Sequence, residues 1–171
     1  MGQDELYREA AGSYGAAMER LAGAYEARAD RRSDLVQEIH IALWRSFAGF
    51  DGRCSLRTWV YRVAHNAATS YVMRQRRNNA PLVTLEDLDT PSNGVSAEVS
   101  VDRARALERL LALIQRLKPL DRQVILSYLE GMDAVAIGEI TGISAGNAAI
   151  KIHRIKQILT RQFHQGGRHG E

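Results

Sequence analysis

Apolar residues recur at three- and four-residue steps along most of the chain, which is the spacing of amphipathic helices. In the N-terminal half this pattern predicts three helices: residues 6–25, a helix from Ser33 as its N-cap to Phe47, and Ser55–Arg77 with Ser55 as its cap. In the C-terminal half it predicts four more: Ala104–Leu117, a helix capped by Asp121 and ending at Leu129, Val135–Thr141, and a helix capped by Ser144 and ending near Phe163. The pattern indicates an all-α fold.

Residues 79–102 interrupt the helical pattern. They contain Pro81, Pro91 and Gly94, together with five acidic residues and no Lys or Arg. Such a composition is typical of a flexible linker. We therefore expect two small helical domains, residues 1–78 and 103–165, joined by a flexible acidic linker at 79–102 and followed by a disordered tail at 166–171.

Two of the predicted helices carry basic residues without acidic ones. No Asp or Glu occurs between Ser55 and Arg77, and none occurs from Ser144 until Glu171. The net charge of +3 is too small to indicate a nucleic-acid partner by itself. A solvated helix normally mixes both signs of charge, so this distribution indicates a polyanionic partner. The alternative is a basic surface with no partner.

The segment 134–152 has the spacing of a helix-turn-helix. Gly138 supplies a small residue where two helices cross closely, and Gly142 supplies a glycine for the turn. The second helix presents Asn147, Lys151, His153, Arg154 and Lys156, which suits a helix in the major groove of DNA. An ordinary helical hairpin is the alternative interpretation.

Other classes of chemistry find little support in the sequence. Cys54 is the single cysteine, the five histidines are scattered, and no nucleophile–base set or Gly-rich phosphate loop occurs. We therefore expect no catalytic residues, no metal site and no cofactor. The absence of a long apolar run or a signal-peptide core predicts a cytoplasmic protein without membrane insertion.

Several runs resemble the bacterial sigma-70 family of RNA polymerase sigma factors. The runs that resemble region 2 are Asp34–Ile39 with Leu43-Trp44, Phe50–Arg53 and Leu56–Asn66. The runs that resemble region 4 are Leu117–Ile125, Gly142–Gly146 and His153-Arg154. The order of these runs, the acidic gap and the short length are similar to the extracytoplasmic-function (ECF) group, which retains only regions 2 and 4.

The resemblance implies a transcription initiation factor with a region 2 helical bundle and a region 4 helix-turn-helix. Such a factor binds core RNA polymerase, recognises the −35 element, and recognises and melts the −10 element. The residues implied to face the β′ clamp helices of polymerase are Asp34, Gln37, Glu38 and Ile41. Those implied to hold the −10 element are Arg53, Arg57, Tyr61, Arg62, Asn66, Arg74, Arg76 and Arg77. Those implied to read the −35 element are Ser144, Asn147, Ile150, Lys151, Arg154 and Lys156.

The resemblance also implies that the second domain contacts the β flap and that an anti-sigma factor is a further partner. The chain departs from the family pattern at Ala149 and Ile150, where a Lys and a Ser commonly stand. Either side chain could pack against a thymine methyl group. Gly138 stands where the family's helix-turn-helix usually has an Ala. Trp59 is expected to pack in the core of the first domain rather than to stack on a DNA base. The acidic linker either mimics nascent RNA in a basic channel or is a simple spacer.

Three other classes of protein remain as alternatives. A dimeric helix-turn-helix regulator would bind DNA without polymerase. A sigma mimic would act only through an anti-sigma partner, although it would not need the basic residues of Arg57–Arg77. An enzyme is the third class, and it lacks the constellations named above.

Overall fold

The computed structural model describes residues 2–79 and 98–165, and the regular elements in these two ranges are helical. The order along the chain is α1 (Gln3–Tyr25), α2 (Ala29–Ser46), a short 3-10 turn (Phe47–Gly49), α3 (Leu56–Asn79), α4 (Glu98–Gln115), α5 (Pro119–Leu129), α6 (Ala134–Thr141) and α7 (Ala145–Gln165). We call α1–α3 the N-terminal bundle and α4–α7 the C-terminal bundle. The all-α prediction is confirmed.

In the N-terminal bundle, three amphipathic helices pack against one another around a shared apolar core. Met18 of α1, Leu35 and Leu43 of α2, and Val60 of α3 are almost completely buried. Ser55 caps α3 as predicted, because its hydroxyl accepts the backbone N–H of Thr58 at 3.0 Å. The prediction that Ser33 caps the second helix is wrong. Good helix formers before Ser33 extend α2 back to Ala29.

In the C-terminal bundle, α6 and α7 form the predicted helix-turn-helix. Gly142 has a φ of 79° at the end of α6, a conformation that favours glycine. Ser144 accepts the backbone N–H of Asn147 at 3.1 Å and so caps α7. The prediction that Asp121 caps the preceding helix is wrong. Pro119 occupies the first position of α5, where its missing N–H costs nothing, and Asp121 falls inside the first turn.

The helix α4 begins at Glu98, earlier than the predicted start at Ala104. The last residues of the predicted linker 79–102 are therefore helical, as is Asn79 at the end of α3. Residues 80–97 and the predicted tail 166–171 lie outside the described residues.

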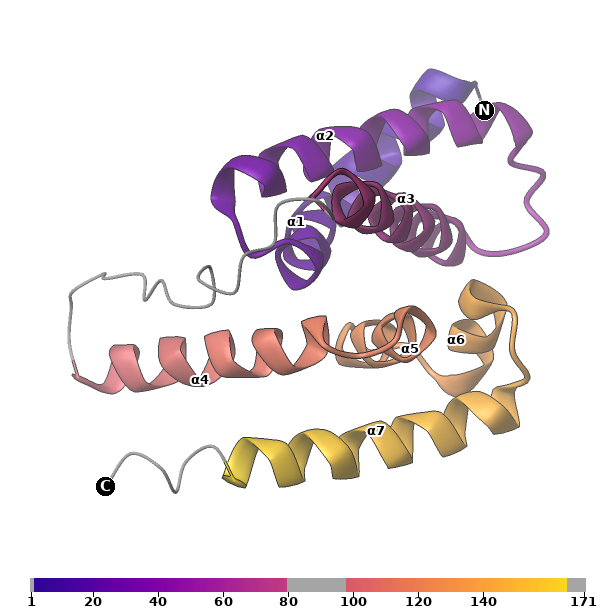
Figure 1. Cartoon of the computed structure of the whole chain (residues 1–171). Coiled ribbons are helices and arrows are strands. Elements are labelled where there is room, and N and C mark those ends of the chain that lie inside the picture. The colour runs from indigo at the N-terminus through magenta and orange to yellow at the C-terminus, as the bar shows by residue number, and fades with distance from the viewer. Residues whose placement is uncertain (1, 80–97, 166–171) are drawn as a thin grey trace.

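The two bundles lie against each other. Figure 1 shows α4 and α5 between the N-terminal bundle and α7. Contacts across this boundary join α1 to α4, and α3 to both α5 and α6. We call this boundary the seam.

The crossing of α6 and α7 depends on Gly138. A Cβ atom at this position would lie 2.7 Å from the carbonyl oxygen of Ile143, a backbone atom that cannot move aside cheaply. The small residue predicted for the crossing is therefore required by the geometry of the turn. Close packing there buries Ile137 and Ala148 completely.

We expect Gly138→Ala to destabilise the C-terminal bundle by about 1–3 kcal/mol, because the added methyl group overpacks the crossing. Thermal unfolding followed by circular dichroism would measure the change. Gly12→Ala on the surface of α1 is the matched control, since a Cβ there meets nothing within 4 Å. The control should gain up to about 1 kcal/mol. A Gly138→Ala protein at least as stable as the wild type would contradict the argument.

Candidate nucleic-acid interface

The helix α3 and the loop before it carry the residues predicted to hold the −10 element. Gly52 turns the loop with a φ of 75°, and Arg53 pairs with Asp51 at 3.0 Å while remaining exposed. Asn66 is exposed in the middle of α3, and Arg76 and Arg77 are exposed near its end. These residues are accessible to a partner.

Two of the predicted −10 residues are exposed or half-exposed but already have protein partners. Arg62 lies over the ring of Trp59 at 5.1 Å, and its guanidinium is 3.2 Å from the sulfur of Cys54. Arg74 forms an ion pair with Glu38 of α2. A residue predicted for DNA thus contacts one predicted for polymerase.

Arg57 and Tyr61 do not lie on an open face, because both contact the C-terminal bundle. The side chain of Tyr61 is 2% exposed, and its hydroxyl donates to the Glu130 carboxylate at 3.1 Å. Arg57 donates to the backbone carbonyl of Glu130. The apolar pattern predicted one buried face of α3. The C-terminal bundle covers a second.

This second face of α3 is polar and is paired along its length with α5 and α6. Its residues follow one another at helical steps of three and four, as neighbours on one helix face do. From one end of the seam to the other, the hydrogen-bonded pairs are Thr58–Glu139 at 3.5 Å, Tyr61–Glu130 at 3.1 Å, His65–Ser127 at 3.2 Å and Thr69–Gln123 at 3.4 Å. This part of the seam is therefore joined by hydrogen bonds, whereas each bundle core is joined by apolar packing.

His65 is the most deeply buried member of this face. Its Nδ1 is 2.9 Å from the Tyr25 hydroxyl, and its Nε2 is 3.2 Å from the Ser127 hydroxyl. The ring is completely buried, and this burial lowers the pKa of His65 to about 3. The imidazole is therefore neutral near pH 7.

Arg122 also lies at the seam and contacts Tyr25, the hydrogen-bond partner of His65. Its guanidinium donates to the carbonyls of Gln115 and Leu117, at the C-terminal end of α4, and lies over the ring of Tyr25 at 5.0 Å. Burial lowers the pKa of Arg122 and raises the pKa of Tyr25 to about 12. A residue of the C-terminal bundle thus packs on the N-terminal one.

The exposed face of α7 is the other predicted DNA surface. Asn147, Ile150 and Arg154 are exposed, with Ile150 67% accessible at the centre of the face. His153 lies beside them and is also exposed. Ser144 serves as the cap of the helix.

Two lysines predicted to contact DNA have partners inside the C-terminal bundle. The ammonium group of Lys151 is 2.6 Å from the Asp121 carboxylate. That of Lys156 lies 5.1 Å from the centre of the Tyr128 ring and 3.2 Å from its hydroxyl. These pairs brace α7 against α5.

The residues predicted to face polymerase lie along α2. Asp34, Gln37 and Ile41 are exposed at helical spacing, and Glu38 is half-buried beside them. Trp44 extends the same face and is 44% exposed. Its indole N–H donates to Asp4 at 2.9 Å, which fixes the ring at the surface.

Sequence reasoning missed three residues of these surfaces. Arg20 and Glu130 pair across the seam, and neither carries a motif that distinguishes it from a solvated charge. Trp44 belongs to a run that resembles the family, and its exposure on the same face of α2 as Ile41 was not predicted. Its position three residues after Ile41 on an amphipathic helix was the available signal.

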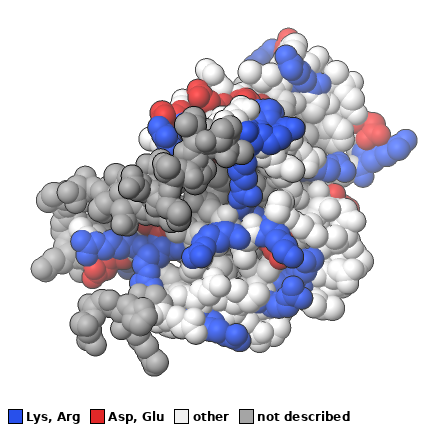
Figure 2. Space-filling view, viewed as in Figure 1, with Lys and Arg blue, Asp and Glu red and all other residues white. Residues whose placement is uncertain are grey.

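Lys and Arg side chains occupy more of the face shown in Figure 2 than Asp and Glu side chains do, and they lie over both bundles.

Within residues 2–79 and 98–165, no three His, Cys, Asp or Glu side chains gather as a metal site would require. No helix in the same ranges is both long and apolar enough to span a membrane.

Comparisons with known proteins agree with this architecture. Residues 11–78 match sigma-70 region 2, and residues 107–159 match sigma-70 region 4. The RNA polymerase sigma factor CarQ of Myxococcus xanthus is 31% identical over 122 residues, which cover 71% of this chain and 68% of CarQ. The ECF RNA polymerase sigma-E factor of Haemophilus influenzae is 29% identical over 145 residues, covering 76% of this chain and 73% of that protein.

A solved structure shows the same fold. The sigma factor RpoE in complex with the anti-sigma factor NepR from Bartonella quintana aligns with a TM-score of 0.68 and 18% identity, over 93% of this chain and 96% of that one. The two helical bundles, one ending in a helix-turn-helix, correspond to the two matched regions. The chain belongs to the extracytoplasmic-function group of the sigma-70 family, and it is a transcription initiation factor that directs RNA polymerase to promoters. Its relatives are not enzymes.

We expect the stability of the N-terminal bundle to fall as the pH drops below about 6.5. The unfolded chain binds a proton at His65 near that pH, whereas the folded chain does so only near pH 3. Between about pH 7 and 5 the free energy of unfolding should fall by up to about 2 kcal/mol through this residue. Urea unfolding followed by the fluorescence of Trp44 and Trp59 measures it.

The matched variants are His65→Gln and His40→Gln. His65→Gln should flatten this part of the pH dependence even though it lowers stability at neutral pH. His40→Gln should keep it, because it leaves His65 in place. An unchanged pH profile in His65→Gln would show that the buried imidazole is not responsible.

Proposed function

We propose that this sigma factor holds the melted non-template strand of the −10 element on α3 and its preceding loop. The proposal is supported by the exposed Arg53, Asn66, Arg76 and Arg77, which offer cations to phosphates and an amide to a base edge. Arg62, stacked on Trp59, adds a cation at the start of the helix. In the closed arrangement Arg57 and Tyr61 contact Glu130 instead. Binding of the strand along all of α3 therefore requires the seam to open.

The exposed face of α7 is the observation that carries the −35 part of the proposal. A capped helix of a helix-turn-helix presents Asn147, Ile150 and Arg154 together, and no acidic residue occurs along it. An Asn amide suits the edge of adenine, and an Arg suits guanine or phosphate. The exposed Ile150 offers an apolar surface to a thymine methyl group. Lys151 and Lys156 brace the helix and act at most as secondary contacts.

The exposed face of α2 is the proposed contact with the β′ clamp helices of core polymerase. Ile41 and Trp44 form its apolar part, and Asp34 and Gln37 supply polar groups at its edge. An apolar centre with a polar rim is the usual organisation of a protein interface. The C-terminal bundle is the proposed contact with the β flap. An anti-sigma factor is a further proposed partner, because the structural relative RpoE was solved with one.

We expect Arg154→Ala to reduce promoter-directed transcription by about tenfold, because a base or phosphate contact of Arg is lost. Run-off transcription on genomic DNA with purified core polymerase measures discrete start sites with and without the protein. Arg105→Ala is the matched control, since Arg105 is exposed on α4 rather than on α7. Equal losses in the two variants would contradict a reading role for α7, and no discrete start sites with the wild type would contradict the function.

We expect Ile41→Glu to weaken binding to core polymerase by roughly tenfold or more, because a charge enters the apolar centre of the contact. Fluorescence anisotropy of the labelled full chain titrated with core polymerase measures the affinity. Met73→Glu is the control, because Met73 is also exposed, at 56%, but lies on α3. The α2 assignment fails if both variants bind core polymerase as the wild type does.

A further inference from the structure

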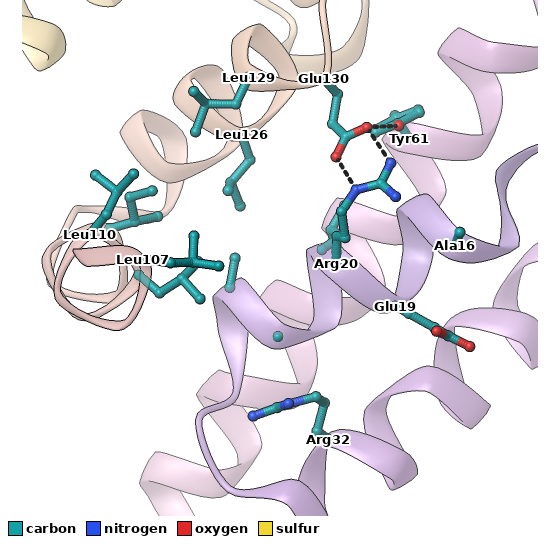
Figure 3. Close-up of a pocket in the computed structure, with 15 residues that line it drawn as sticks. Ala16, Glu19, Arg20, Arg32, Tyr61, Leu107, Leu110, Leu126, Leu129 and Glu130 are labelled. Carbon is teal, nitrogen blue, oxygen red and sulfur yellow. Dashed lines mark hydrogen bonds and ion pairs between the residues drawn. The ribbon is translucent and has the colours of Figure 1, made fainter. Parts of the chain in front are cut away.

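The carboxylate of Glu130 sits in a set of donors that come from the N-terminal bundle. Arg20 of α1 donates to it twice, from Nε to Oε1 at 2.9 Å and from a terminal nitrogen to Oε2 at 2.9 Å. The Tyr61 hydroxyl donates to Oε2 at 3.1 Å, and Arg57 donates to the backbone carbonyl of the same residue. Figure 3 shows Arg20 and Tyr61 directed toward Glu130. The Glu130 carboxylate thus meets two side chains of the N-terminal bundle, and a third side chain meets the backbone carbonyl of the same residue.

We propose that Arg20, Arg57 and Tyr61 form a binding site for a backbone phosphate of single-stranded promoter DNA, and that Glu130 fills this site while the bundles are closed. We call these three residues the phosphate site. The inference rests on the proposed role of α3 in holding the −10 strand. It adds Arg20, a residue of α1, to the DNA surface, and it gives Glu130 the role of an internal competitor.

The geometry of the donors suits a phosphate as well as a carboxylate. An Arg fork that makes two parallel hydrogen bonds matches both groups, because each presents two oxygens at a similar spacing. Tyr61 adds a neutral donor, and Arg57 adds a second positive charge nearby. Because all three residues belong to α1 and α3, the phosphate site stays together when the C-terminal bundle moves away.

The ionisation of the groups is consistent with this role. The hydrogen bond and the charge of Arg20 lower the pKa of Glu130, and the same pairing with Glu130 raises the pKa of Arg20. Burial, followed by the nearby Glu130 charge, raises the pKa of Tyr61, so its hydroxyl keeps the proton that it donates. The site therefore presents donors only, to an anion that is fully charged.

The seam has the properties of a boundary that opens. Its pairs along α3 are polar, and such groups find water as a substitute when two surfaces separate. Beside the phosphate site lies a cavity of about 550 Å³, lined by Arg20 and Glu130 at one side and by Leu107, Leu110 and Leu129 at the other (Figure 3). Two of the residues that line this cavity, Leu107 and Leu129, are 56% and 55% exposed.

The test uses the full chain and a labelled oligothymidylate of about 12 nucleotides, which presents phosphates without a promoter sequence. Fluorescence anisotropy at low salt measures its affinity for the wild type and for Glu130→Gln, Arg20→Gln and the double variant. Glu130→Gln should bind about fivefold more tightly, because removal of the competing charge frees the site. Arg20→Gln should bind no better than the wild type, and the double variant should lose most of the gain.

Arg20→Gln separates a phosphate site from a simple clasp between the bundles. If Arg20 only held the bundles together, its loss would open the seam and tighten binding as much as Glu130→Gln does. That outcome overturns the proposal, as does a double variant that keeps the full gain. Glu139→Gln is the charge-matched control, since Glu139 crosses the same seam to Thr58 and touches none of the three donors. If Glu139→Gln increased the affinity for the oligonucleotide as much as Glu130→Gln does, the proposal would also be overturned. Circular dichroism confirms the fold of each variant.

Arg62→Ala in the Glu130→Gln background distinguishes failure of this inference from failure of the proposed function. If Arg62→Ala weakens binding and Arg20→Gln does not, α3 holds the strand and the phosphate site is refuted. If neither change alters the affinity, both the phosphate site and the proposed role of α3 are refuted. A loss with both supports both.

Discussion

The structure depends on one helix that is covered on two faces. The apolar face of α3, which includes Val60 and Ala64, closes the N-terminal bundle. A polar face that includes Tyr61 and His65 meets the C-terminal bundle through hydrogen bonds. The groups proposed to hold DNA lie on the rest of the same helix and on part of this polar face. If α3 holds the strand as proposed, closure of the molecule and binding of the strand compete for this helix.

The two kinds of contact differ in what their separation costs. Removing Leu35 or Ile137 from its bundle would expose apolar surface to water, at about 25 cal/mol for each Å². Separating the hydrogen-bonded pairs of the seam exchanges them for hydrogen bonds to water, with a small net change for each pair. His65 is the deepest of the groups that would be hydrated, and its pKa would then return toward its ordinary value. Along α3, separation of the two bundles therefore costs less per contact than disruption of either bundle core.

Much of the fold follows from the sequence because its signals are local. Apolar periodicity located the helices, and Ser55 and Ser144 identified two helix starts through hydrogen bonds to residues three positions later. The pairing of Lys151 with Asp121, 30 residues away, has no local signal. The same holds for Arg20 and Glu130, which are 110 residues apart and belong to different bundles. Apolar periodicity identifies the face of a helix that is buried in its own bundle. It does not show whether a polar face of the same helix contacts another bundle.

The bracing of α7 by its own lysines has a consequence for the ions around promoter DNA. A protein that binds a duplex releases about 0.9 counterions for each phosphate that it neutralises. The positive charge of Lys151 is paired with the Asp121 carboxylate, so one positive charge fewer on α7 is free to displace those ions. If α7 binds a duplex as proposed, its affinity should then vary with ionic strength less steeply than its number of basic residues suggests. In the proposed contact, shape and the exposed apolar surface of Ile150 would carry a correspondingly larger share of recognition.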